Sequence, residues 1–344
     1  MFFLYFRCFF IYITNILLYN ITRKSLKHFR DMLMKTGAII LAARRQKDAE
    51  FFQPLQKIDG VTTIRRLIVT LKHSCVSPIV VITGEQGDAL EKEIGRMDVI
   101  CLRNSNYEKM QMFESIQMGL RYIERLCDRI MILPAKFSLF LPQTISKLLN
   151  STAKAACPTF EGRRGHPVLI DKALFPILDA YSGNGGLRAA MELPQIAPYT
   201  EEIPVEDTGI IHALDTEEGF SLAKQRATLP TYCTVNLSFH REESFFQSET
   251  ARFLQLIAHS GSMQTACKQL HISYSKGWKI IKTAESFLGF PLISTQSGGT
   301  SGGSSSLTAK GKLFLDKFLR IEEQLNETAE QSFHELFSNE TIES

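Results

Sequence analysis

The sequence predicts an α/β domain with a mostly parallel sheet, followed by a small helical domain. From Gly37 to about Gly219, short apolar runs rich in Ile and Val alternate with stretches of helical periodicity. From Glu249 onward the pattern is helical, until a Gly/Ser-rich stretch and a final helix. The 344 residues, 44% hydrophobic and 22% charged, are enough for two globular domains.

Residues 1–35 precede the predicted fold and differ from it in composition. The segment MFFLYFRCFFIYITNILLYN is long enough to cross a membrane, and basic residues follow it at Arg23, Lys24, Lys27 and Arg30. We expect residues 1–31 to be an extension upstream of the true start, which would be Met32 or Met34. The alternative is a signal anchor formed by residues 1–20.

Cysteine usage and charge distribution narrow the class of protein. The seven cysteines are scattered and form no C-x-x-C pair, so a reducing cytoplasm fits better than a disulfide framework or a zinc site. The net charge of +3 indicates no partner by itself. Residues 268–320, however, carry eight Lys and Arg against two acids, whereas residues 321–344 carry seven Glu and no Lys or Arg. A basic module therefore precedes an acidic end.

Each element of the α/β domain follows from its pattern. Four apolar runs are predicted as buried strands: AIILAA, PIVVITG, DVICLRN and RIMILPA. Helical spacing lies between them, at Ile64, Leu67, Ile68 and Leu71 and again at Met112, Ile116, Gly119 and Ile123. Such alternation implies a mainly parallel sheet covered on both faces, with ligands beyond the carboxyl ends of the strands. We therefore expect chemistry directly after AIILAA and after MILPA.

Five motifs in residues 37–219 occur in a characteristic order. They are VVITG, NSNYEKMQMFESIQMGL, GRRGHPVLI, GNGGLR and ALDTEE. In this order and at this spacing they resemble the molybdenum-cofactor nucleotidyltransferases, especially the cytidylyltransferase branch. The resemblance implies a Rossmann-like nucleotidyltransferase sheet for residues 36–225.

The positions that perform chemistry in that family are substituted here. The family loop L-A-A-G-x-S-x-R-M-G-x-x-K aligns with Leu41-Ala42-Ala43, but Arg44 replaces its first glycine and Gln53 its lysine. Lys136 and Ala213 replace aspartates that hold Mg²⁺ in the family. Nucleotidyl transfer needs the metal and a basic side chain to neutralise phosphate charge. The resemblance thus implies a domain that has lost catalysis, with no catalytic residue and no metal site, and with Mg²⁺ as a cofactor only if the transferase is active.

We expect the same region to bind a nucleotide or a molybdopterin-type ligand. The candidate ligand-binding residues are Arg44, Arg45, Lys136, Arg163, Gly165, His166 and Asp215. Alternatives remain for several of them. His166 either contacts the substrate or is a hydrogen-bonded histidine in a turn. Arg163 and Arg164 either bind the ligand or are a solvated pair. Lys136 faces either a ligand or water. The alternative for the whole domain is an α/β fold of unrelated function.

The segment GSMQTACKQLHISYSKGWKIIKTAE has a helix–turn–helix pattern. Ala266 is small where two helices approach, and Ser273 is a plausible N-cap for the second helix. On that helix Trp278 and Ile281 are predicted to face the core. Ser275, Lys276, Lys279 and Lys282 fall on the opposite face, and we expect them to bind double-stranded DNA.

This segment and the sequence after it also resemble a known module. Matches at Gly261, Ser262, Tyr274 and Trp278, with the Gly/Ser stretch and the LTAKG motif, are similar to the winged helix of molybdate-responsive regulators, related to the LysR type. The resemblance implies that the Gly/Ser stretch is a wing and that the protein is a homodimer with contacts from its last helix. The alternatives are a winged helix that binds proteins and a flexible Gly/Ser tether.

These observations predict one domain organisation and leave two alternative functions. The predicted parts are residues 1–35, the nucleotidyltransferase-like domain 36–225, a linker 226–247, a winged helix–turn–helix domain 248–325 and an acidic tail 326–344. The leading interpretation is a cytoplasmic transcription regulator with an inactive, ligand-sensing transferase-like domain, linked to molybdenum-cofactor metabolism. The alternative is an active transferase of CTP or GTP to molybdopterin that also carries a DNA-binding domain. Such an enzyme needs metal ligands. Asp215 is one candidate ligand, and Asp128 or Asp207 would have to supply another.

Overall fold

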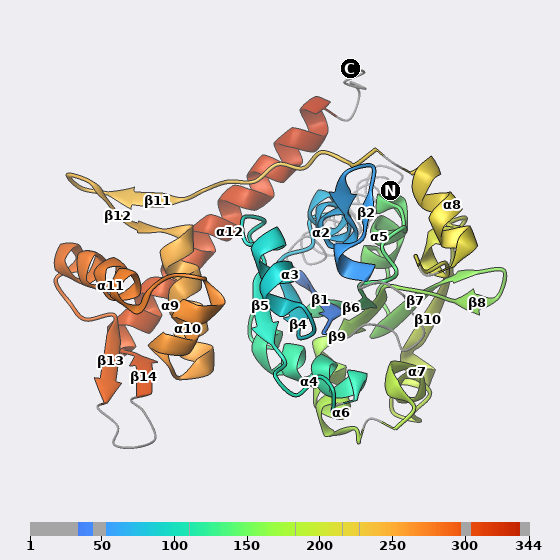
Figure 1. The fold of residues 1–344 in the computed structure, drawn as a ribbon, viewed down its shortest axis with the longest axis horizontal. Coiled ribbons are helices and arrows are strands. Elements are labelled where there is room, and N and C mark those ends of the chain that lie inside the picture. Colours follow the sequence, from blue (N-terminus) through green and yellow to red (C-terminus); the bar gives the residue numbers. More distant parts are fainter. Residues whose placement is uncertain are drawn as a thin grey trace, which may run out of the picture.

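The computed structural model describes residues 34–43, 53–109, 111–182, 184–214, 216–226, 228–296 and 304–337. The extension at residues 1–33 and the candidate residues Arg44, Arg45 and Asp215 lie outside this range. The α/β elements surround one sheet, and the C-terminal elements lie beside them (Figure 1). No helix in the described part of the chain is both long and apolar enough to cross a membrane.

The four apolar runs form the parallel part of the sheet, as predicted. They are β1 (Thr36–Ala42), β4 (Ile79–Thr83), β5 (Ile100–Arg103) and β6 (Arg129–Pro134). Their order is β6-β1-β4-β5, and each neighbouring pair is parallel. Their carboxyl ends therefore meet at one edge of the sheet, where the sequence predicted the ligand site.

The other half of the sheet is mixed. Strand β9 (Val168–Asp171) is antiparallel to both β6 and β7 (Ala155–Phe160), whereas β10 (Thr200–Pro204) is parallel to β7. The chain reverses through β8 (Arg163–Arg164), which pairs with the end of β7. The segment from β8 to β9 therefore returns towards the end of β6, which brings the GHP motif to the edge that holds the candidate site.

Helices cover both faces of the sheet (Figure 1). Because side chains alternate along a strand, Ile39 and Leu41 of β1 pack into one core and Ile40 into the other. The first core includes α4 (Met112–Ile123), α6 (Phe175–Ala180) and α7 (Gly186–Met191). The second includes α2 (Thr63–His73), α3 (Gly87–Ile94) and α5 (Pro142–Leu149). Near its end the domain also has α8 (Glu217–Gln225).

The predicted linker at residues 226–247 contains a hairpin that the sequence pattern did not indicate. Strands β11 (Ser238–His240) and β12 (Ser244–Gln247) pair antiparallel. Phe239 and Phe246 contact Phe318 with ring centroids 5.0 and 4.8 Å apart. The hairpin therefore packs with the C-terminal elements, because its aromatic side chains contact the last helix.

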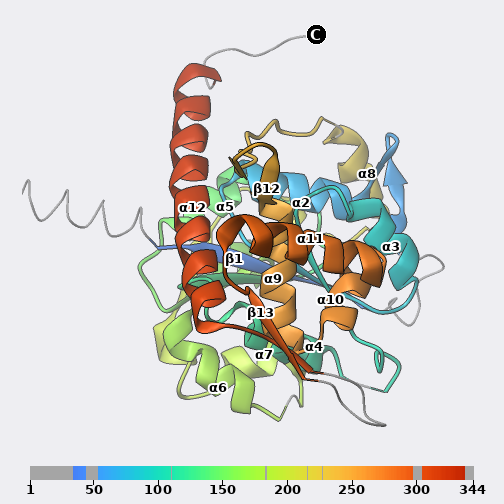
Figure 2. The same cartoon turned by 90° about the vertical axis from the view of Figure 1, so that its left-hand side faces the viewer.

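The C-terminal part has three helices, a two-stranded hairpin and a long helix. They are α9 (Ser248–Ser260), α10 (Met263–Gln269), α11 (Tyr274–Leu288), β13 (Ile293–Gln296), β14 (Ser304–Leu307) and α12 (Ala309–Phe337). Strands β13 and β14 are antiparallel on either side of the Gly/Ser stretch. Helix α12 confirms the predicted final helix, and its second half projects beyond the rest of the structure (Figure 2).

Candidate functional site

The turns that follow β1, β4 and β6 converge at one edge of the sheet. The amide of Glu85 donates to the carbonyl of Ala43 at 2.7 Å, and the amide of Ala135 donates to the carbonyl of Leu41 at 3.0 Å. Asn104, just after β5, is buried and donates through its side chain to Ser115 at 3.2 Å. These bonds fix the backbone at the edge where a ligand of a parallel sheet binds.

Lys136 lies at this edge, two residues after β6. Its ammonium is 5.1 Å from the centre of the Phe137 ring. Its backbone carbonyl accepts a hydrogen bond of 3.3 Å from the amide of Leu214, so Ala213 lies beside it. Both positions where the family resemblance places metal-holding aspartates are therefore neighbours in space, and they carry an ammonium and a methyl group.

His166 belongs to the same cluster. Its ring lies 4.7 Å from that of Phe137, and its amide donates to the carbonyl of Ile210 at 3.0 Å. Burial lowers the pKa of His166 from 6.5 to about 4; the positive charge of Lys136 adds to this, and a backbone hydrogen bond with Ile132 opposes it. His166 is therefore neutral near pH 7. Its Nδ1 atom is enclosed and has no hydrogen-bond partner among the described residues.

The other candidates around the GHP motif have different surroundings. A Cβ atom on Gly165 would lie 2.6 Å from the carbonyl oxygen of Ile210, so only glycine fits this close approach. Arg163 is exposed on β8, and Arg164 forms an ion pair with Glu202 at 2.6 Å. The structure thus brings Lys136, Gly165 and His166 together and leaves the two arginines on an exposed hairpin.

An active transferase would need Asp207 or Asp128 as a further metal ligand, but both carboxylates have other partners. Asp207 is buried and accepts hydrogen bonds from the Leu141 amide, the Thr144 hydroxyl, the Gly209 amide and the Arg226 guanidinium. Asp128 precedes β6, at the opposite end of the strand from Lys136, and pairs with Lys172 at 2.7 Å. Within the described ranges no three His, Cys, Asp or Glu side chains are grouped to hold a metal ion. Neither position at which the resemblance places a metal-holding aspartate carries a carboxylate.

Comparison with known families supports the assignment of this domain. Residues 38–199 match the family described as "MobA-like NTP transferase domain". We therefore call these residues the MobA-like domain, after the family model that they match. The match covers the parallel strands and the Lys136–His166 cluster, and it ends before Ala213.

Solved structures resemble the same part of the chain at a distance. One is a nucleotidyl transferase from Methanothermobacter thermautotroptrophicus, with 15% identity and a TM-score of 0.49 over 56% of this chain and 97% of that one. Another is Rv0371c from Mycobacterium tuberculosis H37Rv, with 14% identity and a TM-score of 0.48 over 56% of this chain and 98% of that one. At these values the likeness extends to the fold at most.

The second candidate site is the first half of α11. The Ser262 hydroxyl accepts from the Thr265 amide at 3.2 Å and caps α10, and the Ser273 hydroxyl accepts from the Lys276 amide at 3.1 Å and caps α11. The predicted cap at Ser273 is confirmed. Gly277 allows α11 to approach α10, because a Cβ atom there would lie 2.5 Å from the Cys267 sulfur.

The predicted DNA-binding side chains share an exposed face of α11. Four side chains of this face are exposed: Ser275, Lys276, Lys279 and Lys282. On the other side of the helix, Ile281 is buried and Trp278 is half-buried, as the helical spacing predicted. Lys282 differs from the other lysines because it pairs with Glu285 at 2.8 Å and lies 5.2 Å from the Trp278 ring centre. Lys276 and Lys279 are therefore the lysines of this face best placed for a new partner.

Two curated relatives are similar over a short part of the chain. The transcriptional regulator ModE of Haemophilus influenzae is 28% identical over 90 residues, which are 26% of this chain and 34% of that protein. The molybdenum-pterin-binding protein MopB of Rhodobacter capsulatus is 24% identical over 90 residues, 26% of this chain and 33% of that protein. The chain thus spans about a third of the length of each of these relatives.

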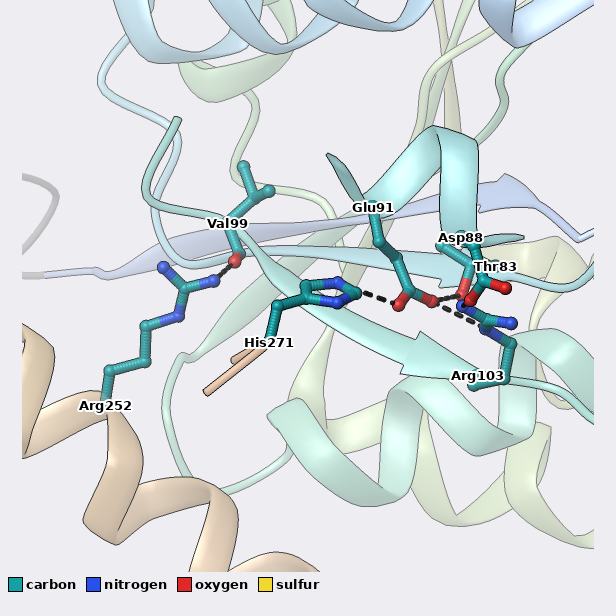
Figure 3. Close-up of polar contacts among 7 residues, drawn as sticks. All are labelled: Thr83, Asp88, Glu91, Val99, Arg103, Arg252 and His271. Carbon is teal, nitrogen blue, oxygen red and sulfur yellow. Dashed lines mark hydrogen bonds and ion pairs between the residues drawn. The ribbon is translucent and has the colours of Figure 1, made fainter. Parts of the chain in front are cut away.

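A polar cluster that no sequence pattern indicated lies between the MobA-like domain and the C-terminal helices. Glu91 of α3 contacts Thr83, Arg103 and His271 (Figure 3). The one sequence signal was an acidic residue at a position of α3 that the helical pattern buries. Its partners come from three separate segments, which no local pattern connects.

Proposed function

We propose that this protein is a DNA-binding transcription regulator whose MobA-like domain senses a phosphate-bearing ligand and does not transfer nucleotides. The C-terminal part is a winged helix–turn–helix domain in this proposal, with α11 as the recognition helix and β13–β14 as the wing. The likeness to the regulator ModE and to the molybdenum-pterin-binding protein MopB supports a link to molybdenum-cofactor metabolism.

The observation that carries the proposal is the basic, exposed face of α11. Lys276 and Lys279 lie one helical turn apart near the N-terminal end of a capped helix. A recognition helix enters the major groove with residues of this end towards the bases, and lysines there contact guanine edges or phosphates. Because both side chains are exposed while the opposite face of α11 is packed on α10, binding needs no rearrangement of the helix itself.

The ligand-sensing part of the proposal is supported by the Lys136 cluster. An ammonium beyond the end of a parallel strand can contact phosphate oxygens directly and replace part of the charge that a metal supplies in a transferase. The enclosed Nδ1 of neutral His166 is a polar ring atom that has no hydrogen-bond partner within the described residues. A nucleotide or a molybdopterin-type molecule offers both phosphate and polar ring groups.

The proposal includes a homodimer formed through α12. Large apolar side chains are exposed on this helix, and Ile321, Leu325 and Leu336 share one face at spacings of four and eleven residues. A row of this kind is typical of a helix that packs against a partner helix. A dimer would present two copies of α11 to a pseudo-palindromic DNA site.

The alternative, an active transferase that carries a DNA-binding domain, has less support. It needs a metal site, and Asp207 and Asp128 already have other partners. Asp215 lies outside the described residues.

Selection from genomic DNA tests the proposed function. The full chain is mixed with sheared genomic DNA at low and at near-physiological salt, and bound fragments are sequenced. We expect a small set of fragments to be enriched in both conditions, and the double variant Lys276→Ala/Lys279→Ala to lose this enrichment. Recovery of unselected DNA only, or of no DNA, would contradict a regulator that recognises its own sites.

A further inference from the structure

Glu91 is a buried carboxylate that connects the ligand edge of the sheet to the C-terminal helices. Its side chain is 6% exposed. One oxygen, Oε1, accepts from the Thr83 hydroxyl at 2.5 Å and from the Arg103 guanidinium at 2.7 Å. Thr83 and Arg103 are the last residues of β4 and β5. Glu91 is therefore held by two groups at the edge where the proposed ligand binds.

The other oxygen of Glu91 faces the C-terminal domain. Oε2 lies 3.3 Å from Nε2 of His271, which is in the turn between α10 and α11 (Figure 3). His271 lies three residues before the start of α11, and its amide donates to the carbonyl of Lys268. One carboxylate thus contacts both the strand ends of the MobA-like domain and the turn that positions the proposed recognition helix.

Other polar contacts also join the two parts. Arg252 of α9 donates to the carbonyl of Val99 and lies 3.7 Å from Asp98, and His259 packs on Tyr122 with ring centres 4.4 Å apart. Next to these contacts is an open cleft of about 1520 Å³ lined by residues of both parts. Because part of this junction is polar and borders a cleft, its geometry can change at a modest free-energy cost.

We propose that Glu91 couples ligand binding in the MobA-like domain to the position of the turn before α11. This inference rests on the proposed function, since it names how the site is read out. A phosphate near the ends of β4 and β5 competes for Arg103, which also pairs with Asp88 at 2.8 Å. A buried carboxylate that loses its guanidinium partner depends more on its remaining partner, His271. Ligand binding therefore tightens the contact at the turn.

Hydrogen–deuterium exchange of the full chain tests the coupling without DNA or ligand. The readout is the exchange rate of peptides that cover residues 268–276. We expect His271→Ala to raise this rate. Thr83→Val and Arg103→Ala each remove a donor to Glu91, so they should lower it about fivefold or more. The effect of either should disappear in the His271→Ala background and persist with His259→Ala, a matched change at the same interface that does not contact Glu91.

The outcomes separate this inference from the proposed function. If neither Thr83→Val nor Arg103→Ala changes the exchange rate at residues 268–276, the coupling is overturned. It is also overturned if these variants change the rate equally in the wild-type and His271→Ala backgrounds. Thr83→Val guards against misfolding of the arginine variant, because it removes a single hydroxyl. Adding CTP in EDTA should reproduce the slower exchange in the wild type. If CTP does not bind, sensing of this nucleotide fails, whereas the variants still decide whether Glu91 connects the two parts.

Discussion

The backbone amide of Leu214 donates a hydrogen bond of 3.3 Å to the backbone carbonyl of Lys136. This bond holds Ala213 beside Lys136, at the carboxyl end of β6. In the nucleotidyltransferase family that this chain resembles, these two positions carry metal-holding aspartates. They are adjacent here, and neither has a carboxylate. An Mg²⁺ ion at this point would meet an ammonium, which repels it.

The first prediction is the absence of nucleotidyl transfer. Purified protein with CTP, GTP or ATP, a pterin acceptor and Mg²⁺ or Mn²⁺ should release no pyrophosphate above one equivalent per chain, because the charge of the leaving group is not neutralised by a metal. Pyrophosphate release measured over many hours checks this. An activity of multiple turnovers that co-purifies with the protein and is lost in Asp215→Ala would show that a metal site exists after all.

Much of the α/β domain could be predicted from the sequence, for a physical reason. Strands β1, β4, β5 and β6 are buried on both faces, so their apolar runs are continuous and easy to recognise. The β11–β12 hairpin was missed because its phenylalanines pack on α12, more than sixty residues later in the chain. A short strand with distant partners leaves no periodic signal.

The candidate sites could be predicted only in part. The exposed face of α11 follows from helical spacing, which is local. The surroundings of His166 depend on Phe137 and Ile210, and the role of Glu91 depends on Thr83 and His271. These contacts join segments far apart in the sequence. Sequence alone therefore left two interpretations of His166, and for Glu91 it offered only an acidic residue at a buried helical position.

The second prediction concerns ligand binding without a metal. Calorimetry in EDTA with nucleotides and a pterin cofactor should detect binding, and Lys136→Ala should weaken it by roughly 1.5–3 kcal/mol, as expected for loss of a charged hydrogen-bond donor. Lys147→Ala on α5 is the matched control, because this lysine is exposed and lies outside the cluster. Binding that requires added Mg²⁺, or that is unchanged by Lys136→Ala, would contradict the proposed role of the ammonium.

The third prediction is a pH dependence of stability from His166. Its pKa falls from 6.5 to about 4 in the folded protein, so between these values the unfolded chain binds more protons than the folded one. The folded state is therefore fully favoured above pH 6.5 and loses roughly 2–4 kcal/mol as the pH falls to 4.

Urea unfolding of the wild type and of His166→Gln, followed by circular dichroism from pH 7 to pH 4, measures this term. Other groups titrate equally in both proteins, so the difference between their free energies of unfolding isolates His166. That difference should shift against the wild type by the stated amount as the pH falls. A difference independent of pH would mean that His166 is not buried as a neutral ring.

The fourth prediction concerns the exposed apolar face of α12. Leu325→Asp should shift the protein from dimer to monomer in sedimentation, because it places a charge in the centre of the proposed helix contact. Gln324→Asp adds the same charge next to this face and should leave the dimer intact. A wild-type monomer at micromolar concentration, or a dimer insensitive to Leu325→Asp, would remove α12 as the dimer contact.

DNA binding by the face of α11 tests the central claim most directly. Fluorescence anisotropy with a duplex recovered from the genomic selection should show binding that weakens as salt rises. Lys276→Ala and Lys279→Ala should each cost roughly 1–3 kcal/mol if the lysine contacts a base, or lower the salt slope by about one if it contacts a phosphate. Lys147→Ala should bind like the wild type. Wild-type protein that binds no duplex at low salt, or lysine variants that bind as tightly as the wild type, would contradict the account.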